Sequence, residues 1–129
     1  EVLSKMRQLW EADPYDGDIA WGYLSRLNGK AGCKEYLRVL DGESGLIRFN
    51  QSQYLLAEQR RIDCVVELDY KNRLDDIIDG YLNAEEIDES LLEYVIQTLR
   101  VKRATAFSRL CSQNQSKWEG VLGRKVPCP

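Results

Sequence analysis

The sequence predicts an all-α domain in which a long antiparallel helix hairpin is packed by three shorter helices. The first observation is that apolar residues recur at intervals of three and four along most of the 129 residues, which is helical spacing. The second is that residues 46–49 are the only candidate for extended structure, and four residues are too few to build a sheet on. The length fits a single domain over 1–129, and the 43% hydrophobic content is enough for a core.

Residues 1–50 are expected to hold the three short helices. The first, over 1–12, places its apolar side chains on one stripe: Val2, Leu3, Met6, Leu9 and Trp10. A turn cluster over 13–17 ends it, and Asp18 is a good N-cap for a second helix that stops at Asn28 and Gly29. A third short helix is predicted over Cys33–Leu40.

Residues 51–113 are expected to form the helical hairpin. No glycine or proline interrupts residues 52–79, and Gly80 is predicted to end this helix. Asn83 and Glu86 then have the spacing of a capping box, which begins a helix that runs to about Gln113. Two long helices joined by a tight turn make an antiparallel pair, and residues 114–129 follow as a C-terminal tail.

Four cysteines, an even number in a small chain, favour two disulfides and an oxidising compartment. Within the predicted hairpin, Cys64 and Cys111 lie roughly 20 Å apart, too far for a bond between them. Two connectivities remain: Cys33–Cys64 with Cys111–Cys128, or Cys33–Cys111 with Cys64–Cys128. We favour the first, because Cys111 and Cys128 are near in sequence and the tail can fold back so that Cys128 pins it.

The compartment suggested by the cysteines is supported by two glycosylation acceptors, Asn50-Gln51-Ser52 and Asn114-Gln115-Ser116. The chain begins at Glu1 without an initiator methionine, so we expect a mature form or an excised domain. No apolar run approaches the roughly 18 residues of a membrane-spanning helix, and no membrane insertion of this piece is expected. Together these features predict an extracellular or secretory-pathway protein, either secreted or an ectodomain.

The charges are segregated along the chain. Residues 63–93 carry eleven acids and two bases, whereas residues 100–125 carry seven bases and one acid. Solvated helix faces and helix dipoles explain most of this pattern. The alternative is a bipolar recognition surface, whose candidate binding residues are Asp75, Asp76, Asp79, Arg100 and Arg103. A net charge of −3 makes nucleic acid a poor partner.

Trp118 is the remaining candidate for binding. It follows the polar stretch 112–117, so we expect an exposed anchor, or a lid held by the Cys111–Cys128 loop. Replacing such an anchor with alanine is expected to leave folding intact. Core packing is the expected role of Trp10 and Trp21, which lie at helical spacing.

The absence of histidine removes the usual Ser-His-Asp and Cys-His systems and most catalytic zinc sites, so no catalytic residue and no cofactor is predicted. Residues 75–86 resemble an EF-hand loop over twelve positions, with Asp75, Asp79, Gly80 and Glu86 at positions 1, 5, 6 and 12. Ile77 occupies position 3, where an oxygen ligand is needed, so metal binding is not expected.

These observations predict a non-enzymatic recognition module that binds a protein partner. Two alternatives remain open at this point. One is a degenerate EF-hand-like domain that responds to calcium, and the other is a small secreted helical carrier of an apolar ligand.

Overall fold

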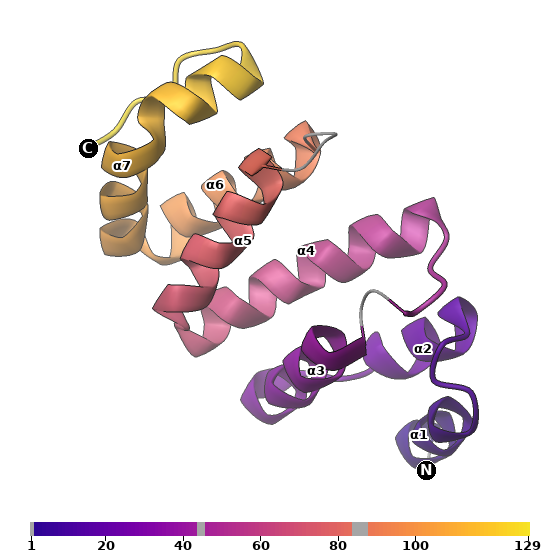
Figure 1. Cartoon of the computed structure of the whole chain (residues 1–129). Coiled ribbons are helices and arrows are strands. Elements are labelled where there is room, and N and C mark those ends of the chain that lie inside the picture. The colour runs from indigo at the N-terminus through magenta and orange to yellow at the C-terminus, as the bar shows by residue number, and fades with distance from the viewer. Residues whose placement is uncertain (1, 44–45, 84–87) are drawn as a thin grey trace. The chain divides into compact units, whose positions relative to one another are not determined.

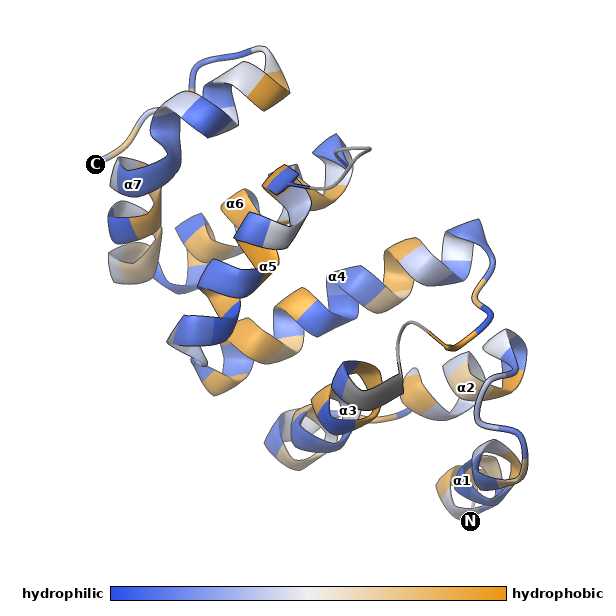
Figure 2. Ribbon diagram, in the orientation of Figure 1, coloured by the Kyte–Doolittle hydropathy of each residue, from blue (hydrophilic) through white to orange (hydrophobic). Residues whose placement is uncertain are grey.

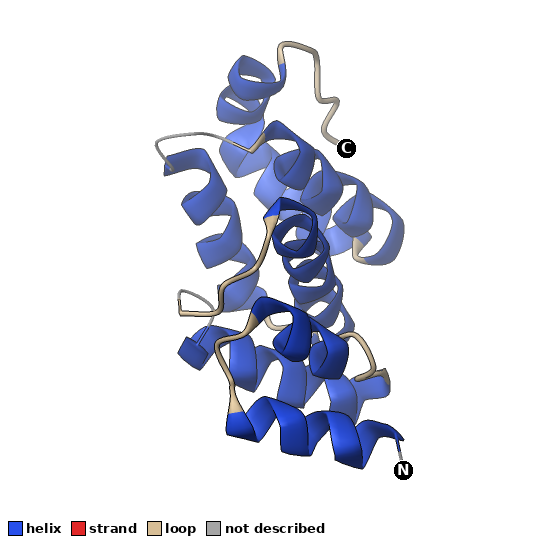
Figure 3. Cartoon of the chain, turned by 90° about the vertical axis from the view of Figure 1, so that its right-hand side faces the viewer, coloured by secondary structure: helices blue, strands red, loops and turns tan. Residues whose placement is uncertain are grey.

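The computed structural model describes residues 2–43, 46–83 and 88–129, and this part of the chain contains seven α-helices (Figure 1). They are α1 (Val2–Ala12), α2 (Gly17–Leu24), α3 (Gly29–Glu43), α4 (Gln51–Leu68), α5 (Lys71–Asn83), α6 (Glu89–Lys102) and α7 (Ala104–Leu122). Figure 3 shows helices and loops but no strand in the described residues, where the only extended contact is a single bridge between Asp16 and Arg48. The all-α prediction is confirmed. None of the described helices has both the length and the apolar character that crossing a membrane requires.

The chain divides into two compact units, an N-terminal unit over Glu1–Leu68 and a C-terminal unit over Asp69–Pro129. In the N-terminal unit α1 packs on α2, while α2 and α3 both pack on α4. In the C-terminal unit α5, α6 and α7 contact one another. Figure 2 shows orange and blue residues side by side along most of these helices, as amphipathic helices require.

The two long helices expected over 52–79 and 83–113 are each interrupted, so that part of the prediction is wrong. Between α4 and α5, Asp69 has a φ of 56°, a left-handed conformation that ends a right-handed helix. Between α6 and α7, Arg103 has φ and ψ of −140° and 70°, which are also not helical. Four shorter helices, α4 to α7, therefore replace the two long helices of the predicted hairpin.

The last helix, α7, continues to Leu122 instead of ending near Gln113. It ends where Gly123 adopts a φ of 67°, and the Gly123 N–H donates to the Glu119 carbonyl. The tail then folds back on α7. The Val126 N–H donates to the Glu119 carboxylate at 2.8 Å, and the Gln115 amide donates to the Val126 carbonyl at 2.9 Å.

The structure confirms the favoured disulfide connectivity. Cys33–Cys64 ties α3 to α4 with its Cα atoms 5.0 Å apart, and Cys111–Cys128 holds the tail on α7 with its Cα atoms 5.6 Å apart. The alternative pairing is wrong. Each bridge lies within one unit, and a native disulfide in a domain of this size contributes about 2–4 kcal/mol.

Several helix starts differ from the prediction. Asp16, not Asp18, caps α2, because its carboxylate accepts from the Ile19 N–H at 2.9 Å. The third helix begins at Gly29, before the predicted Cys33, and ends at Glu43.

The segment expected to turn between two helices is also different. Gly80 lies inside α5, which ends at Asn83, so Asn83 does not begin the next helix. Asp88 caps α6 instead, by accepting from the Leu91 N–H at 3.1 Å. The other half of the predicted capping box, Glu86, lies outside the described residues.

Candidate functional site

The first helix is only partly covered by the rest of the N-terminal unit. No residue of α1 is buried, and Val2, Leu3 and Leu9 keep 64%, 43% and 52% of their surface exposed. Trp10 is half-buried and stacks on the buried Tyr23 with ring centroids 5.1 Å apart. Helix α1 therefore contacts the unit along part of its apolar stripe, and the remainder of that stripe faces solvent.

Leu3, one of these exposed residues, lines an open cleft of about 550 Å³, here called the N-terminal cleft. Its lining includes apolar side chains from α1, from the α2–α3 connection and from α3, namely Leu3, Leu27 and Ala31. It also includes charged side chains, namely Arg7, Arg26 and Glu35. An apolar lining with a few fixed polar groups is typical of a surface that binds another molecule.

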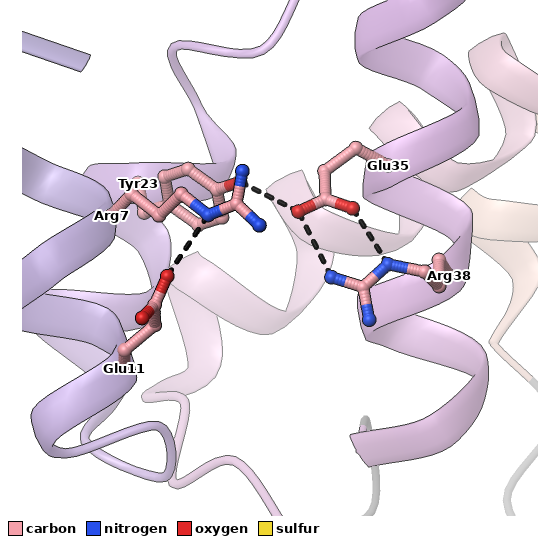
Figure 4. A network of polar contacts seen from close by, with 5 residues as sticks. All are labelled: Arg7, Glu11, Tyr23, Glu35 and Arg38. Carbon is pink, nitrogen blue, oxygen red and sulfur yellow. Dashed lines mark hydrogen bonds and ion pairs between the residues drawn. The ribbon is translucent and has the colours of Figure 1, made fainter. Parts of the chain in front are cut away.

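A network of polar contacts fixes the carboxylate in this cleft. The Tyr23 hydroxyl donates to Glu35 Oε2 at 2.7 Å, and the Arg38 guanidinium donates to both Glu35 oxygens at 2.7 and 3.0 Å. Figure 4 shows Glu35 lying between these two donors, one from α2 and one from its own helix. On α1, Arg7 donates to Glu11 at 3.0 Å. Glu35 is therefore held in one position.

Charge and burial set the protonation states in the network. Burial, followed by the hydrogen bond to Glu35, raises the pKa of Tyr23 to about 12. The Arg38 guanidinium, assisted by the Tyr23 hydroxyl, lowers the pKa of Glu35 below its usual value. At neutral pH, Tyr23 is therefore a neutral donor and Glu35 is an ionised acceptor.

The C-terminal unit has a cleft of a different character where α6 meets α7. This basic cleft has a volume of about 450 Å³ and is lined by Lys102, Arg103, Arg109 and one carboxylate, Asp69. The first turn of α7 completes the lining with residues 104–106. Arg103 is the residue before that turn, and no side chain caps the helix there.

Of the two arginines predicted to bind a partner, only Arg103 lines this cleft. The Arg100 guanidinium instead lies over the Phe107 ring, 5.0 Å from its centroid, and donates to Gln97 at 3.5 Å. Arg100 thus packs on the core of the C-terminal unit by a cation–π contact. The sequence did not indicate Lys102 and Arg109 as binding residues, although both belong to the basic stretch.

The predicted acidic residues all lie on α5, where they differ in their contacts. Asp75 pairs with Arg109 at 3.3 Å, so part of the bipolar charge pattern is neutralised within the C-terminal unit. Asp76 and Asp79 are exposed on the opposite side from the buried Leu74 and Ile78. Arg124 and Glu93 form a further ion pair between the two charged stretches.

Trp118 is not an exposed anchor, and that prediction is wrong. It is 0% exposed and stacks on Phe107 with ring centroids 6.4 Å apart. Because α7 continues to Leu122, helical spacing places Trp118 on the same face as Phe107 and Cys111. Its indole N–H is buried and has no hydrogen-bond partner among the described residues.

The two predicted glycosylation acceptors have different surroundings. Asn50 is exposed before α4, and it forms a capping box: Asn50 Oδ1 accepts from the Gln53 N–H at 2.8 Å and Gln53 Oε1 accepts from the Asn50 N–H at 3.1 Å. Asn114 is half-buried inside α7, and its Nδ2 donates to the Leu110 carbonyl at 2.9 Å. N-linked glycans attach to the Nδ2 atom of asparagine, and at the half-buried Asn114 this atom is already hydrogen-bonded. Asn50 is therefore the more accessible of the two motifs.

The part of the EF-hand-like segment that the structure describes is helical. Residues 75–83 belong to α5, whereas an EF-hand needs a looped backbone there, and residues 84–86 lie outside the described ranges. Among the residues with described positions, no three histidine, cysteine or acidic side chains form a group that could hold a metal ion.

Comparisons of the chain with protein-family models, curated proteins and solved structures found no match. The chemistry of the two clefts is therefore what indicates a function. The N-terminal cleft adjoins exposed apolar side chains, whereas the basic cleft is lined mainly by cations.

Proposed function

We propose that this protein is a non-enzymatic recognition module, secreted or part of an ectodomain, that binds a protein partner through its N-terminal unit. The observation that carries the proposal is the exposed apolar part of α1 beside the N-terminal cleft. Apolar side chains left at a surface next to a cleft are a common mark of a protein-binding site. Both disulfides of the chain support an oxidising compartment, and the exposed Asn50 supports passage through the secretory pathway.

The expected partner segment is an amphipathic helix with an apolar face and acidic flanks. Leu3 both lines the cleft and is 43% exposed, so it can contact an apolar side chain of the partner. Helix-in-groove recognition uses anchors of this kind. Acidic flanks are favoured because the cleft is lined by two arginines and one carboxylate, and that carboxylate already binds Arg38 in a bidentate pair.

The arginines are available for such a partner. Arg7 pairs with Glu11, both exposed on α1, and ion pairs of this type contribute only about 0–1 kcal/mol. Arg26 is exposed and donates to the Gly22 carbonyl, a contact that leaves its charge unneutralised. A partner carboxylate would therefore displace little.

The proposal is tested by measuring binding to a panel of purified ectodomains by biolayer interferometry. Leu3→Glu and Arg26→Glu should each weaken a genuine interaction at least about tenfold, which corresponds to about 1.4 kcal/mol. Leu56→Glu is the matched control, because Leu56 is an apolar residue on α4 that is 48% exposed and does not line the cleft.

Two results would contradict the proposal. One is that no ectodomain binds, and the other is that binding is lost equally in the Leu56→Glu control. Binding that disappears with EDTA and returns with calcium would instead support the calcium-responsive alternative.

A further inference from the structure

We infer that the basic cleft of the C-terminal unit is an oxyanion site that accepts a phosphate or sulfate group. The site lies in a different unit from the proposed protein-binding surface and shares no residue with it. The inference therefore does not depend on the proposed function. Three observations support it: the charge of the lining, the donors that line it, and the size of the cleft.

The lining carries an excess of positive charge. Lys102, Arg103 and Arg109 face one lining carboxylate, Asp69. Lys102 is exposed and makes no ion pair within the described ranges. Three cations in one cleft attract an anion more strongly than scattered surface charges do.

The two ion pairs at the cleft are open to solvent. Asp69 lies 3.9 Å from Arg103, and Asp75 lies 3.3 Å from Arg109. The two carboxylate side chains keep 47% and 42% of their surface exposed, so water competes with both pairs. An oxyanion that contacts the Arg109 guanidinium gains charge-assisted hydrogen bonds with a geometry that suits tetrahedral oxyanions.

Neutral donors in the same cleft complete the site. The first hydrogen bond inside α7 runs from the Phe107 N–H to the Arg103 carbonyl, so the amides of residues 104–106 precede the helical ladder. These three residues line the cleft, and Thr105 adds a hydroxyl to the amides. No acidic residue occupies the first turn, and no side chain of residues 2–43, 46–83 or 88–129 caps it, so the amides remain available to an anion.

The size of the cleft indicates what carries the oxyanion. A volume of about 450 Å³ is within the usual range for small-molecule sites and exceeds what a single inorganic ion needs. The group bound is therefore expected to belong to a small phosphate or sulfate ester.

The test titrates the full chain with methyl phosphate and methyl sulfate at constant ionic strength, with sodium chloride as the blank. Amide NMR shifts of Thr105 and Ala106 report on the cleft directly in the unsubstituted protein. We expect saturable shifts at these amides, because both residues line the cleft. A phosphate ester carries nearly two charges at neutral pH and a sulfate ester only one, so a preference between them identifies the source of the oxyanion.

The variant Lys102→Ala/Arg109→Ala should weaken binding about tenfold or more, since it removes two of the three cations that line the cleft. Lys117→Ala/Lys125→Ala is the matched control, because it removes the same charge from exposed residues of the C-terminal unit outside the cleft. The control variant and Arg26→Glu should both bind normally.

Non-saturating shifts, or equal weakening in the two double variants, would overturn the inference. The first result would show that the anions occupy no defined site in the cleft. The second would show that net charge and not the cleft attracts them.

Discussion

Replacing Trp118 with alanine is expected to destabilise the C-terminal unit strongly. The side chain is 0% exposed and stacks on Phe107, so the substitution removes a large aromatic ring from the core. Substitutions of this kind cost about 3–5 kcal/mol. A typical domain has a free energy of unfolding of about 5–15 kcal/mol, so the loss is a large part of the total.

The indole N–H, which has no hydrogen-bond partner in the described part of the chain, places the expected cost of Trp118→Ala in the lower part of that range. Burying a donor without an acceptor costs about 1–3 kcal/mol, and the substitution removes this penalty together with the ring. We therefore expect about 3 kcal/mol for Trp118→Ala. Trp118→Phe keeps an aromatic ring against Phe107 and also removes the unpaired N–H, so it should cost less than about half as much.

The assay is urea unfolding followed by far-UV circular dichroism, with both disulfides kept oxidised. At a slope of about 1–3 kcal/mol per molar urea, the midpoint of Trp118→Ala should fall by about 1–3 M. Val101→Ala is the control, because Val101 is 79% exposed and its substitution should stay within about 0.5 kcal/mol. A Trp118→Ala variant as stable as this control would refute the placement of the ring in the core.

Three further predictions follow from individual residues. Gly17→Ala should lower the melting temperature, because a Cβ there would collide with a backbone carbonyl. Gly120→Ala should stabilise the protein by about 0.5–1 kcal/mol, because Gly120 lies in α7 with open space around it. Equal melting temperatures for the two variants would contradict this pair of predictions. The free energy of unfolding should fall between pH 10 and about 12, because the pKa of Tyr23 is about 12 in the folded protein against 10.0 in the unfolded chain, and Tyr23→Phe should lose less over this interval. Limited dithiothreitol should reduce the disulfide of the half-buried Cys128 before that of the buried Cys64. Alkylation and mass spectrometry report the order in which the thiols appear, and earlier labelling of Cys64 would contradict the prediction.

The helical class and the disulfide pairing could be predicted from the sequence, because both depend on spacing. The helix breaks could not, since Asp69 and Arg103 are neither glycine nor proline and no local signal marks them. Aspartate tolerates the left-handed conformation better than most residues, but it also occurs widely inside helices. The packing of α5 against α6 and α7 is available only from the structure.

Two site residues had signals in the sequence that a different interpretation would have used. Asn50 and Gln53 have capping-box spacing, a signal that overlaps the Asn50-Gln51-Ser52 glycosylation motif. Trp118 continues the helical spacing of Phe107 and Cys111, so extending that helix past Gln113 would have predicted its burial. The basic cleft had a partial signal, because Lys102, Arg103 and Arg109 all belong to the basic stretch 100–125, whereas Asp69 joins them only through folding.

The arrangement of the disulfides bears on whether unfolding of one unit extends to the other. All four cysteines are used within units, so the only covalent connection between the halves is the backbone at the Leu68–Asp69 boundary. Melting or a harmful substitution in one half need not propagate to the other, and calorimetry of the intact chain can then record two separate heat-absorption peaks. Heating can therefore unfold one of the two proposed sites while the other site stays folded.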